Sequence, residues 1–142
     1  MDIIIGSDHA GFGLKEACRR HLSETSNHRV VDAGTFDCAS IDYPRVAHQV
    51  AQAVANGEYE RGILICGTGI GMSMVANRYR KVRAALCHEL YTVRMARMHN
   101  DANILAMGGR VLGEGIALEM VDLFLETPFE GGRHALRVSQ FD

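Results

Sequence analysis

Residues Gly62–Tyr79 read GILICGTGIGMSMVANRY and combine a strand, a glycine-rich turn and a helix in one continuous stretch. The first five residues, Gly62–Cys66, carry no charge, which is typical of a strand buried on both faces of a sheet. Three glycines within Gly67–Gly71 then break the apolar pattern, and we expect a helix to follow to about Tyr79. A strand that leads through a turn into a helix is the first half of a βαβ unit, in which successive strands run parallel.

Strand-like and helical patterns alternate along the rest of the chain in the same way. We expect strands at Asp2–Ser7, Arg29–Asp32, Gly62–Cys66, Arg83–Cys87 and Ile104–Met107. We expect further helices at Leu14–Ser23, from Asp42 to about Asn56, at Tyr91–Met98, at Glu114–Glu126 and, as a short one, in the tail after Phe129. Right-handed crossovers between parallel strands place helices on both faces of the sheet. The sequence therefore predicts a single α/β domain over residues 1–142, with three layers around a five-stranded parallel sheet.

The composition is that of an ordinary globular domain and argues against several function classes. Of the 142 residues, 47% are hydrophobic and 23% charged, which suits one domain with one core. The formal net charge of −2 provides no electrostatic basis for binding nucleic acid or an acidic membrane surface. No apolar run approaches the ~20 residues of a membrane-spanning helix, and the N-terminal residues do not match a signal peptide. The cysteines form no C-x-x-C pair and the histidines no H-x-x-x-H array, so we expect a reduced, cytoplasmic protein without a metal site.

Reactive side chains stand where the predicted strands end. Asp8 and His9 follow the first strand, Cys66–Thr68 ends the third, and Arg110 follows the fifth through two glycines. Ligands of parallel α/β sheets bind beyond the carboxyl ends of the strands, so these positions are the candidates for a site. Asp8 is suited to orienting His9 or to binding a sugar hydroxyl, and equally to capping the helix that follows.

The turn Cys66–Gly71, CGTGIG, has the strongest chemical signal in the chain. Its alternate glycines leave backbone N–H groups uncovered beside the positive end of a helix, and such a loop can bind phosphate or an oxyanion. The spacing matches neither a P-loop, which requires a lysine, nor the G-x-G-x-x-G fingerprint. The neighbouring amide dipoles favour the thiolate form of Cys66. A buried cysteine beside a tight turn, with Thr68 capping the helix, is the alternative that the spacing leaves open.

Two further groups of candidates lie in the second half of the chain. His99 and Asn100 end a predicted helix, where His99 is either an acid–base group or a charged cap on the helix dipole. We expect Asn100 to be the left-handed residue that ends the helix or a ligand for a hydroxyl group. Arg133 and Arg137 share one helical face, which suits a dianionic phosphate but equally a solvated helix. His134 is one residue off that face, and we expect no special role for it.

Five segments together resemble one family, the ribose-5-phosphate isomerase B / LacAB sugar-phosphate isomerases. They are GSDHAGFGLK at 6–15, DYP at 42–44, GILICGTGIGMSMVANR at 62–78, HNDANILAMGGRV at 99–111 and FEGGRHALRV at 129–138. The similarity runs in order from Ile4 to the end of the chain. It implies a Rossmann-like α/β/α sandwich, no metal and no cofactor, and a homodimer or dimer of dimers whose sites lie between subunits.

The resemblance assigns a role to each candidate residue. The family's catalytic cysteine falls on Cys66, and because no acid occurs at Ile70–Met74, the glutamate used by some members does not apply here. The ring-opening histidine falls on His99, and we expect Thr68 to assist proton transfer between oxygens. Phosphate binding falls on His9 and the three arginines at 110, 133 and 137. The residues expected to contact substrate are Asp8, His9, Tyr43, Gly67, Thr68, Gly69, Ile70, Gly71, Asn100, Arg110, Arg133 and Arg137.

The expected reaction is the interconversion of an aldose phosphate and its ketose phosphate. His99 opens the sugar ring, the Cys66 thiolate carries a proton from C2 to C1, and the N–H groups of Gly67–Gly71 stabilise the enediolate between the two steps. Ribose 5-phosphate is the first-choice substrate, followed by allose 6-phosphate, galactose 6-phosphate and four-carbon sugar phosphates. The galactose-6-phosphate members use two different subunits with incomplete sites, whereas this chain carries the full set, which favours a self-sufficient homo-oligomer.

Three other functions fit parts of the pattern. A non-catalytic sugar-phosphate sensor needs only the phosphate-binding residues, and so leaves Cys66 and His99 unexplained. A thiol enzyme needs a resolving partner for Cys66, which no C-x-x-C spacing supplies. A nucleotide-binding module needs the missing lysine or a different glycine spacing.

Overall fold

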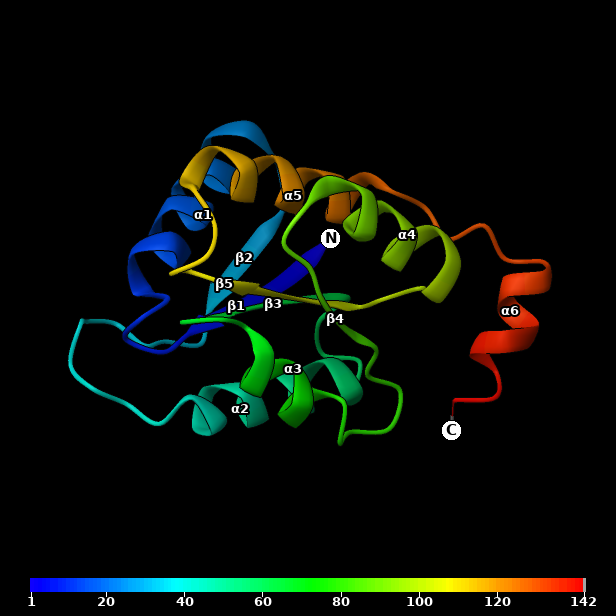
Figure 1. Cartoon of the computed structure of the whole chain (residues 1–142), viewed down its shortest axis with the longest axis horizontal. Helices are drawn as coiled ribbons and strands as arrows, with labels where there is room; N and C mark the ends of the chain where they lie inside the picture. Colours follow the sequence, from blue (N-terminus) through cyan, green and yellow to red (C-terminus); the bar gives the residue numbers. More distant parts are fainter. Residues whose placement is uncertain (142) are drawn as a thin grey trace.

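Five parallel strands form one sheet in the computed structural model, which describes residues 1–141 (Figure 1). The central strand β3 pairs with β1 on one side and with β5 on the other. Gly62–Cys66, within β3, is buried throughout because helices cover both faces of the sheet. The predicted five-stranded parallel sheet is therefore confirmed. Its strands, in the spatial order β2-β1-β3-β5-β4, are β1 (Asp2–Ser7), β2 (Arg29–Asp32), β3 (Arg61–Cys66), β4 (Ala84–Leu86) and β5 (Ile104–Gly108).

Six helices accompany the sheet. Figure 1 shows α1, α4 and α5 over one face of the sheet and α2 and α3 over the other. The short helix α6 stands outside these layers and contacts α4. The predicted three-layer α/β/α sandwich is thus confirmed, and no helix within residues 1–141 has the length and apolar character needed to cross a membrane. The helices are α1 (Phe12–Thr25), α2 (Tyr43–Ala55), α3 (Ile70–Ala76), α4 (Leu90–Asn100), α5 (Glu114–Glu126) and α6 (Arg133–Val138).

The alternation of side chains along each strand divides the core in two. Ile63 and Ile65 of β3 pack into the core formed with α1, α4 and α5. Leu64 and Cys66 point to the opposite face and pack into the core formed with α2 and α3. This explains why the whole strand is apolar, and it places the side chain of Cys66 on the side of the sheet that α2 and α3 cover.

The chain path separates the two ends of the sheet. After β4 the chain enters α4, which runs back against the strand direction and ends at Asn100, just before β5 begins at Ile104. The segment before α6 is tied to this end of α4, because the backbone N–H of Glu130 donates to the carbonyl oxygen of Met98 at 3.0 Å. In Figure 1 the loops that follow β1 and β2 lie at the left of the sheet and α6 lies at the right. Residues at the end of α4 and on α6 therefore belong to the amino end of the sheet.

One helix is shorter than predicted. α3 ends at Ala76 instead of about Tyr79. The next side chain, Asn77, bonds both backbone groups of Ala84, donating to its oxygen at 2.9 Å and accepting its N–H at 2.8 Å. These two hydrogen bonds tie the end of the helix to β4 and stop it from continuing.

The end of α4 also differs from the prediction. Asp101, not Asn100, has the left-handed backbone that ends the helix, with φ of 46°. Its carboxylate accepts hydrogen bonds from Arg83 at 2.8 Å and from Arg97 at 2.9 Å. These contacts hold the left-handed residue in place, and they involve an arginine that lies 18 positions away in the chain.

Candidate active site

Cys66 ends β3 with its side chain buried (5% exposed) at the carboxyl end of the sheet. The backbone N–H of Gly69 donates a hydrogen bond to its sulfur at 3.1 Å. The loops after β3 and β5 are joined beside it, since Gly109 N–H donates to the carbonyl oxygen of Cys66 (2.8 Å) and Arg110 N–H donates to that of Gly67 (3.0 Å). The sulfur is therefore held at the start of the glycine-rich loop by a backbone amide.

The alternate glycines of this loop allow neighbouring groups to approach its backbone. Gly69 has φ of 77°, and a Cβ on it would meet the backbone oxygen of Met107 at 2.8 Å. A Cβ on Gly71 would meet the ring of Tyr43 at 2.5 Å, because that ring packs against the loop. Both glycines are therefore required by packing, and Tyr43 lies beside the loop that ends in Gly71.

The outer side of the loop is open. Thr68 and Ile70 are exposed, and the Thr68 hydroxyl oxygen accepts the backbone N–H of Ile70 at 3.3 Å. The N-cap position of α3 is Gly69, which has no side chain. Thr68 therefore satisfies the N–H of Ile70, the first residue of the helix, from one position before the N-cap. Its hydroxyl proton remains as a donor toward a bound molecule.

Asp8 and His9 leave β1 at the same end of the sheet. Asp8 is buried, and its Oδ1 accepts the N–H groups of Ala10 (2.9 Å) and Gly11 (3.0 Å). The N-cap position of α1 is Gly11, so Asp8 closes the turn ahead of the helix and does not cap it. His9 Nδ1 accepts the backbone N–H of Ile41 at 3.3 Å. Because a backbone N–H can only donate, neutral His9 carries its proton on Nε2, which makes that atom a donor for an anion.

Arg110 completes this first group of residues. A Cβ on Gly67 would lie 3.6 Å from Cδ and 3.7 Å from Nη1 of Arg110, so the guanidinium lies against the loop. Its positive charge beside uncovered N–H groups favours a bound anion. The predicted residues that the structure brings to the carboxyl end of the sheet are Asp8, His9, Tyr43, Cys66, Gly67–Gly71 and Arg110.

The remaining predicted residues lie at the amino end of the sheet. His99 and Asn100 occupy the last turn of α4, and Arg133 and Arg137 are exposed on α6, one turn apart on the same helical face. The prediction that His99 and Asn100 lie at a helix C-terminus is confirmed. The arginines at 133 and 137 do not share a surface with Arg110 of the same chain.

His134 has a place that the spacing of α6 does not predict. It is buried (7% exposed) and stacks on His99, with ring centroids 4.2 Å apart and ring planes at 5°. Glu130 Oε2 lies 3.4 Å from Nε2 of His134 and 3.9 Å from Nε2 of His99. The stacking of His134 on His99 was not predicted, because helical spacing describes α6 alone and says nothing of α4 packed against it. The i, i+4 spacing of Glu130 and His134 is the signal that could have suggested this cluster.

The His99–Glu130–His134 cluster also has the residue types of a metal site. The donor atoms of these three side chains all lie within 4.8 Å of one another. Imidazole lone pairs lie in the ring plane, however, so two parallel stacked rings cannot both point at one ion. Arg133 and Arg137 add positive charge around His134, which opposes a bound cation. The arrangement fits a stacked histidine pair better than a metal centre.

Cys66 and His99 do not meet within one chain. Gly62 pairs with Ile104 near the amino end of the sheet, and Cys66 pairs with Gly108 at the carboxyl end. Four residues at 3.3 Å each separate these pairs by about 13 Å. His99 precedes Ile104, at the end of a helix that runs back from the carboxyl end of the sheet. It therefore lies farther from Cys66, along the strand direction, than Ile104 does. The predicted site is therefore divided into two halves on opposite ends of the sheet.

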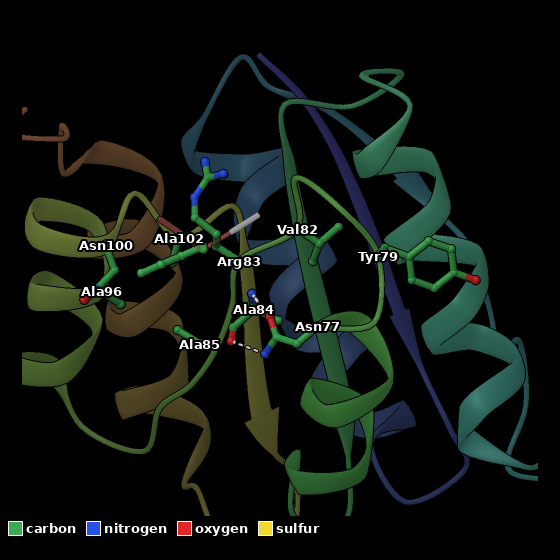
Figure 2. A pocket seen from close by; sticks show the side chains of 10 residues that line it. Asn77, Tyr79, Val82, Arg83, Ala84, Ala85, Ala96, Asn100 and Ala102 are labelled. Carbon is green, nitrogen blue, oxygen red and sulfur yellow. Dashed lines mark hydrogen bonds between the residues drawn. The ribbon is translucent and has the colours of Figure 1, made fainter. Parts of the chain in front are cut away.

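A cavity of about 410 Å³ opens beside Asn100 (Figure 2). Figure 2 shows Ala96 and Asn100 of α4 on one side and Asn77, bonded to Ala84, on the other. Phe141, near the end of the chain, contributes to the lining. The cavity lies along β4, which is an edge strand of the sheet. It is separate from the loop that holds Cys66.

Comparison with known proteins extends over nearly the whole chain. Residues 3–141 match the family model described as Ribose/Galactose Isomerase. The chain is 48% identical over 136 residues to ribose-5-phosphate isomerase B of Escherichia coli (strain K12), covering 96% of this chain and 91% of that protein. It is 39% identical over 142 residues to D-erythrulose-4-phosphate isomerase of Pectobacterium atrosepticum, covering 99% and 92%.

The fold agrees with these relatives. The solved structure of ribose-5-phosphate isomerase B from Clostridium thermocellum matches with a TM-score of 0.96 at 50% identity, covering 99% of this chain and 94% of that one. The resemblance inferred from five short segments is thus confirmed over the full length. The chain belongs to the Ribose/Galactose Isomerase family of sugar isomerases.

Proposed function

We propose that this protein interconverts ribose 5-phosphate and ribulose 5-phosphate. The observation that carries the proposal is the position of Cys66, whose sulfur accepts the N–H of Gly69 inside a glycine-rich, anion-binding loop. The relatives from Escherichia coli and Clostridium thermocellum are both named for ribose 5-phosphate. About half of all residues are identical to each of them, which supports the same sugar phosphate as substrate.

Ring opening is the first chemical step. Ribose 5-phosphate in water is mainly a ring, in which C1 is not yet an aldehyde. His99 takes the proton of the anomeric hydroxyl and delivers a proton to the ring oxygen, which breaks the bond between C1 and that oxygen. The product is the open-chain aldehyde.

The second step moves a proton between two carbons. The Cys66 thiolate removes the proton on C2, and the electron pair of that bond forms the enediolate, with negative charge on O1. Gly69 and Ile70 already donate their N–H groups to Cys66 Sγ and Thr68 Oγ1, so the other N–H groups of the Gly67–Gly71 loop stabilise this charge. Cys66 then returns the proton to C1, while Thr68 assists the transfer of the hydroxyl proton from O2 to O1. This gives ribulose 5-phosphate without any cofactor.

In this proposal a second copy of the chain completes the site. The protein is therefore a homodimer or a dimer of dimers. Exposed apolar side chains surround the Cys66 loop at the carboxyl end of the sheet, where another molecule would cover them. They are Ile70, Met74, Leu86 and Tyr91, of which Met74 is 62% and Tyr91 69% exposed. Exposed apolar groups gathered around a site are typical of a protein interface. The second copy supplies His99 and Asn100 to this Cys66.

Phosphate binding is shared in the same way. His9 and Arg110 come from the copy that holds Cys66, and Arg133 and Arg137 come from the other. Three guanidinium groups and the Nε2–H of His9 around one dianionic group keep the phosphate away from the reacting carbons and place C1 and C2 against the sulfur. The cytoplasmic location expected from the sequence stays a prediction.

A four-carbon sugar phosphate is the second candidate substrate, ahead of allose 6-phosphate. The relative from Pectobacterium atrosepticum is named for D-erythrulose 4-phosphate and aligns with 99% of this chain. Its identity of 39% is lower than the 48% shared with the Escherichia coli protein, which is why ribose 5-phosphate comes first.

A coupled isomerase assay tests the proposal. The purified protein is measured with ribose, allose, galactose and erythrose phosphates, with Cys66→Ala as the control. We expect the highest kcat/KM with ribose 5-phosphate and a fall in kcat of at least about 100-fold in the variant, since it lacks the base. Calorimetry should show that the variant still binds the sugar phosphate.

Each other result has a definite meaning. Normal turnover by Cys66→Ala would show that another group is the base. A clear preference for a different sugar would keep the mechanism and replace the substrate. If no sugar phosphate is turned over but one is bound, the protein is a sensor.

A further inference from the structure

We propose that His134 and Glu130 are positioning residues that hold the ring of His99 in one orientation for ring opening. The inference rests on the role proposed for His99. Neither residue is expected to touch the reacting atoms; both act through the His99 ring.

His134 provides a flat, immobile support. The side chain of His99 is 37% exposed at the end of α4, where an unsupported ring would turn freely. The ring of His134 lies parallel to it at 4.2 Å, and His134 itself is buried. Its backbone N–H donates to the carbonyl oxygen of Gly131 at 3.0 Å, which fixes the start of α6. Stacking on a buried ring removes rotational freedom from His99 and so reduces the cost of orienting it in the reaction.

The carboxylate of Glu130 faces both rings. A single carboxylate oxygen, Oε2, faces Nε2 of both histidines, at 3.4 and 3.9 Å. The backbone N–H of Glu130 donates to the carbonyl oxygen of Met98, the residue just before His99. The backbone that carries this carboxylate is therefore hydrogen-bonded to the last turn of α4, which also carries His99. Within residues 1–141, Nε2 of His134 is buried without a hydrogen bond, so a small shift of Glu130 would satisfy it.

The surroundings of His134 disfavour positive charge on its ring. Burial first, and then the charges of His99 and Arg133, lower the pKa of His134, while Glu130 acts in the opposite direction and Arg137 adds a smaller lowering. This direction agrees with a supporting role for the buried ring.

Nuclear magnetic resonance tests the contact without any substrate. In the full-length protein labelled with ¹⁵N-histidine, His134→Ala should shift the ring protons of His99, because a stacked ring no longer lies beside them. His134→Phe, which keeps a flat ring, should preserve the ring-current shift. Glu130→Gln should change the ring nitrogen shifts of His99. Unchanged His99 signals in His134→Ala and Glu130→Gln would overturn the inference.

Kinetics test whether the contact serves ring opening. His134→Ala should lower kcat for ribose 5-phosphate by up to about 100-fold with little change in KM, and His134→Phe should restore part of it. Exchange of the C1 proton of ribulose 5-phosphate with D₂O needs Cys66 but no ring opening, so it should persist in His134→Ala. Equal losses of isomerisation and exchange would reveal a merely structural role and overturn the inference.

His21 provides a matched control. Its Nε2 lies 2.8 Å from the carboxylate of Asp122 between α1 and α5, so it also pairs with an acid but far from His99. His21→Ala should alter neither the His99 signals nor kcat, and a His21 effect equal to that of His134→Ala would count against a specific contact. If the wild-type protein does not isomerise ribose 5-phosphate, the proposed function fails, and the His99 spectra alone then decide the inference.

Discussion

Two inactive variants, Cys66→Ala and His99→Asn, should restore activity to each other when their subunits are exchanged. Cys66 lies at the carboxyl end of the sheet and His99 beyond its amino end, about 13 Å or more away along the strands. One chain therefore cannot place both at the same substrate. In a hybrid dimer, the His99→Asn chain supplies Cys66 and the Cys66→Ala chain supplies His99, so one of the two sites is complete.

The recovered activity follows from two-fold symmetry. Random pairing of equal amounts makes half of the dimers hybrids, and each hybrid has one complete site of two, so about one quarter of the wild-type activity should return. The coupled ribose 5-phosphate assay measures it after subunit exchange, and native mass spectrometry counts the hybrids. A matched control mixes Cys66→Ala with the chain that carries both substitutions, for which no site is complete. Hybrids that form without regaining activity would refute the division of the site between copies.

Three further predictions concern single residues. Arg137→Ala should raise KM for ribose 5-phosphate by about 10- to 100-fold, which corresponds to the free energy of one hydrogen bond to a charged group. The effect on kcat should be smaller. An unchanged KM in the same assay would remove Arg137 from the phosphate site. Iodoacetamide at pH 8 should label the exposed Cys38 and spare Cys18, as detected by peptide mass mapping. The reason is that burial raises the pKa of the Cys18 thiol to about 12 and keeps it protonated. Rapid labelling of Cys18 would contradict this. Asp32→Asn should lower the free energy of unfolding by about 1–3 kcal/mol in urea titrations, because the fully buried ammonium of Lys15 loses the nearer of its two carboxylates, Asp32 at 2.6 Å, and keeps only Glu16 at 2.8 Å. Combining it with Lys15→Met should cost less than Asp32→Asn alone, and a larger loss would show that the pair is not coupled.

Local pattern was enough to predict the sheet and which candidate residues gather at its carboxyl end. Gly62–Cys66 is uncharged because both faces of β3 are covered, and that requirement is visible in five consecutive residues. The alternate glycines of the next loop are likewise explained by their immediate neighbours, since a Cβ on Gly69 or Gly71 would collide with Met107 or Tyr43. The parallel sheet then gathers the residues that follow β1, β3 and β5 at one end, because all parallel strands point the same way.

Other features depended on contacts between distant parts of the chain. The helix end at Asp101 is held by Arg83, and the end of α3 is held by Ala84, neither of which helical periodicity can reveal. The exposure of Met74 also escapes periodicity, since an exposed apolar side chain on a helix looks the same in sequence as one in the core.

The sequence by itself determined the fold class, the family and the identity of Cys66 as the candidate base, because each of these is written in short segments whose residue types are constrained by their immediate neighbours. Only the tertiary structure decided that His99 and Cys66 lie at opposite ends of the sheet and that a buried His134 stacks on the ring of His99. The physical reason is that the direction of α4 and the docking of α6 set these distances. Both depend on how packed elements cross in space, and spacing along the chain contains no measure of that.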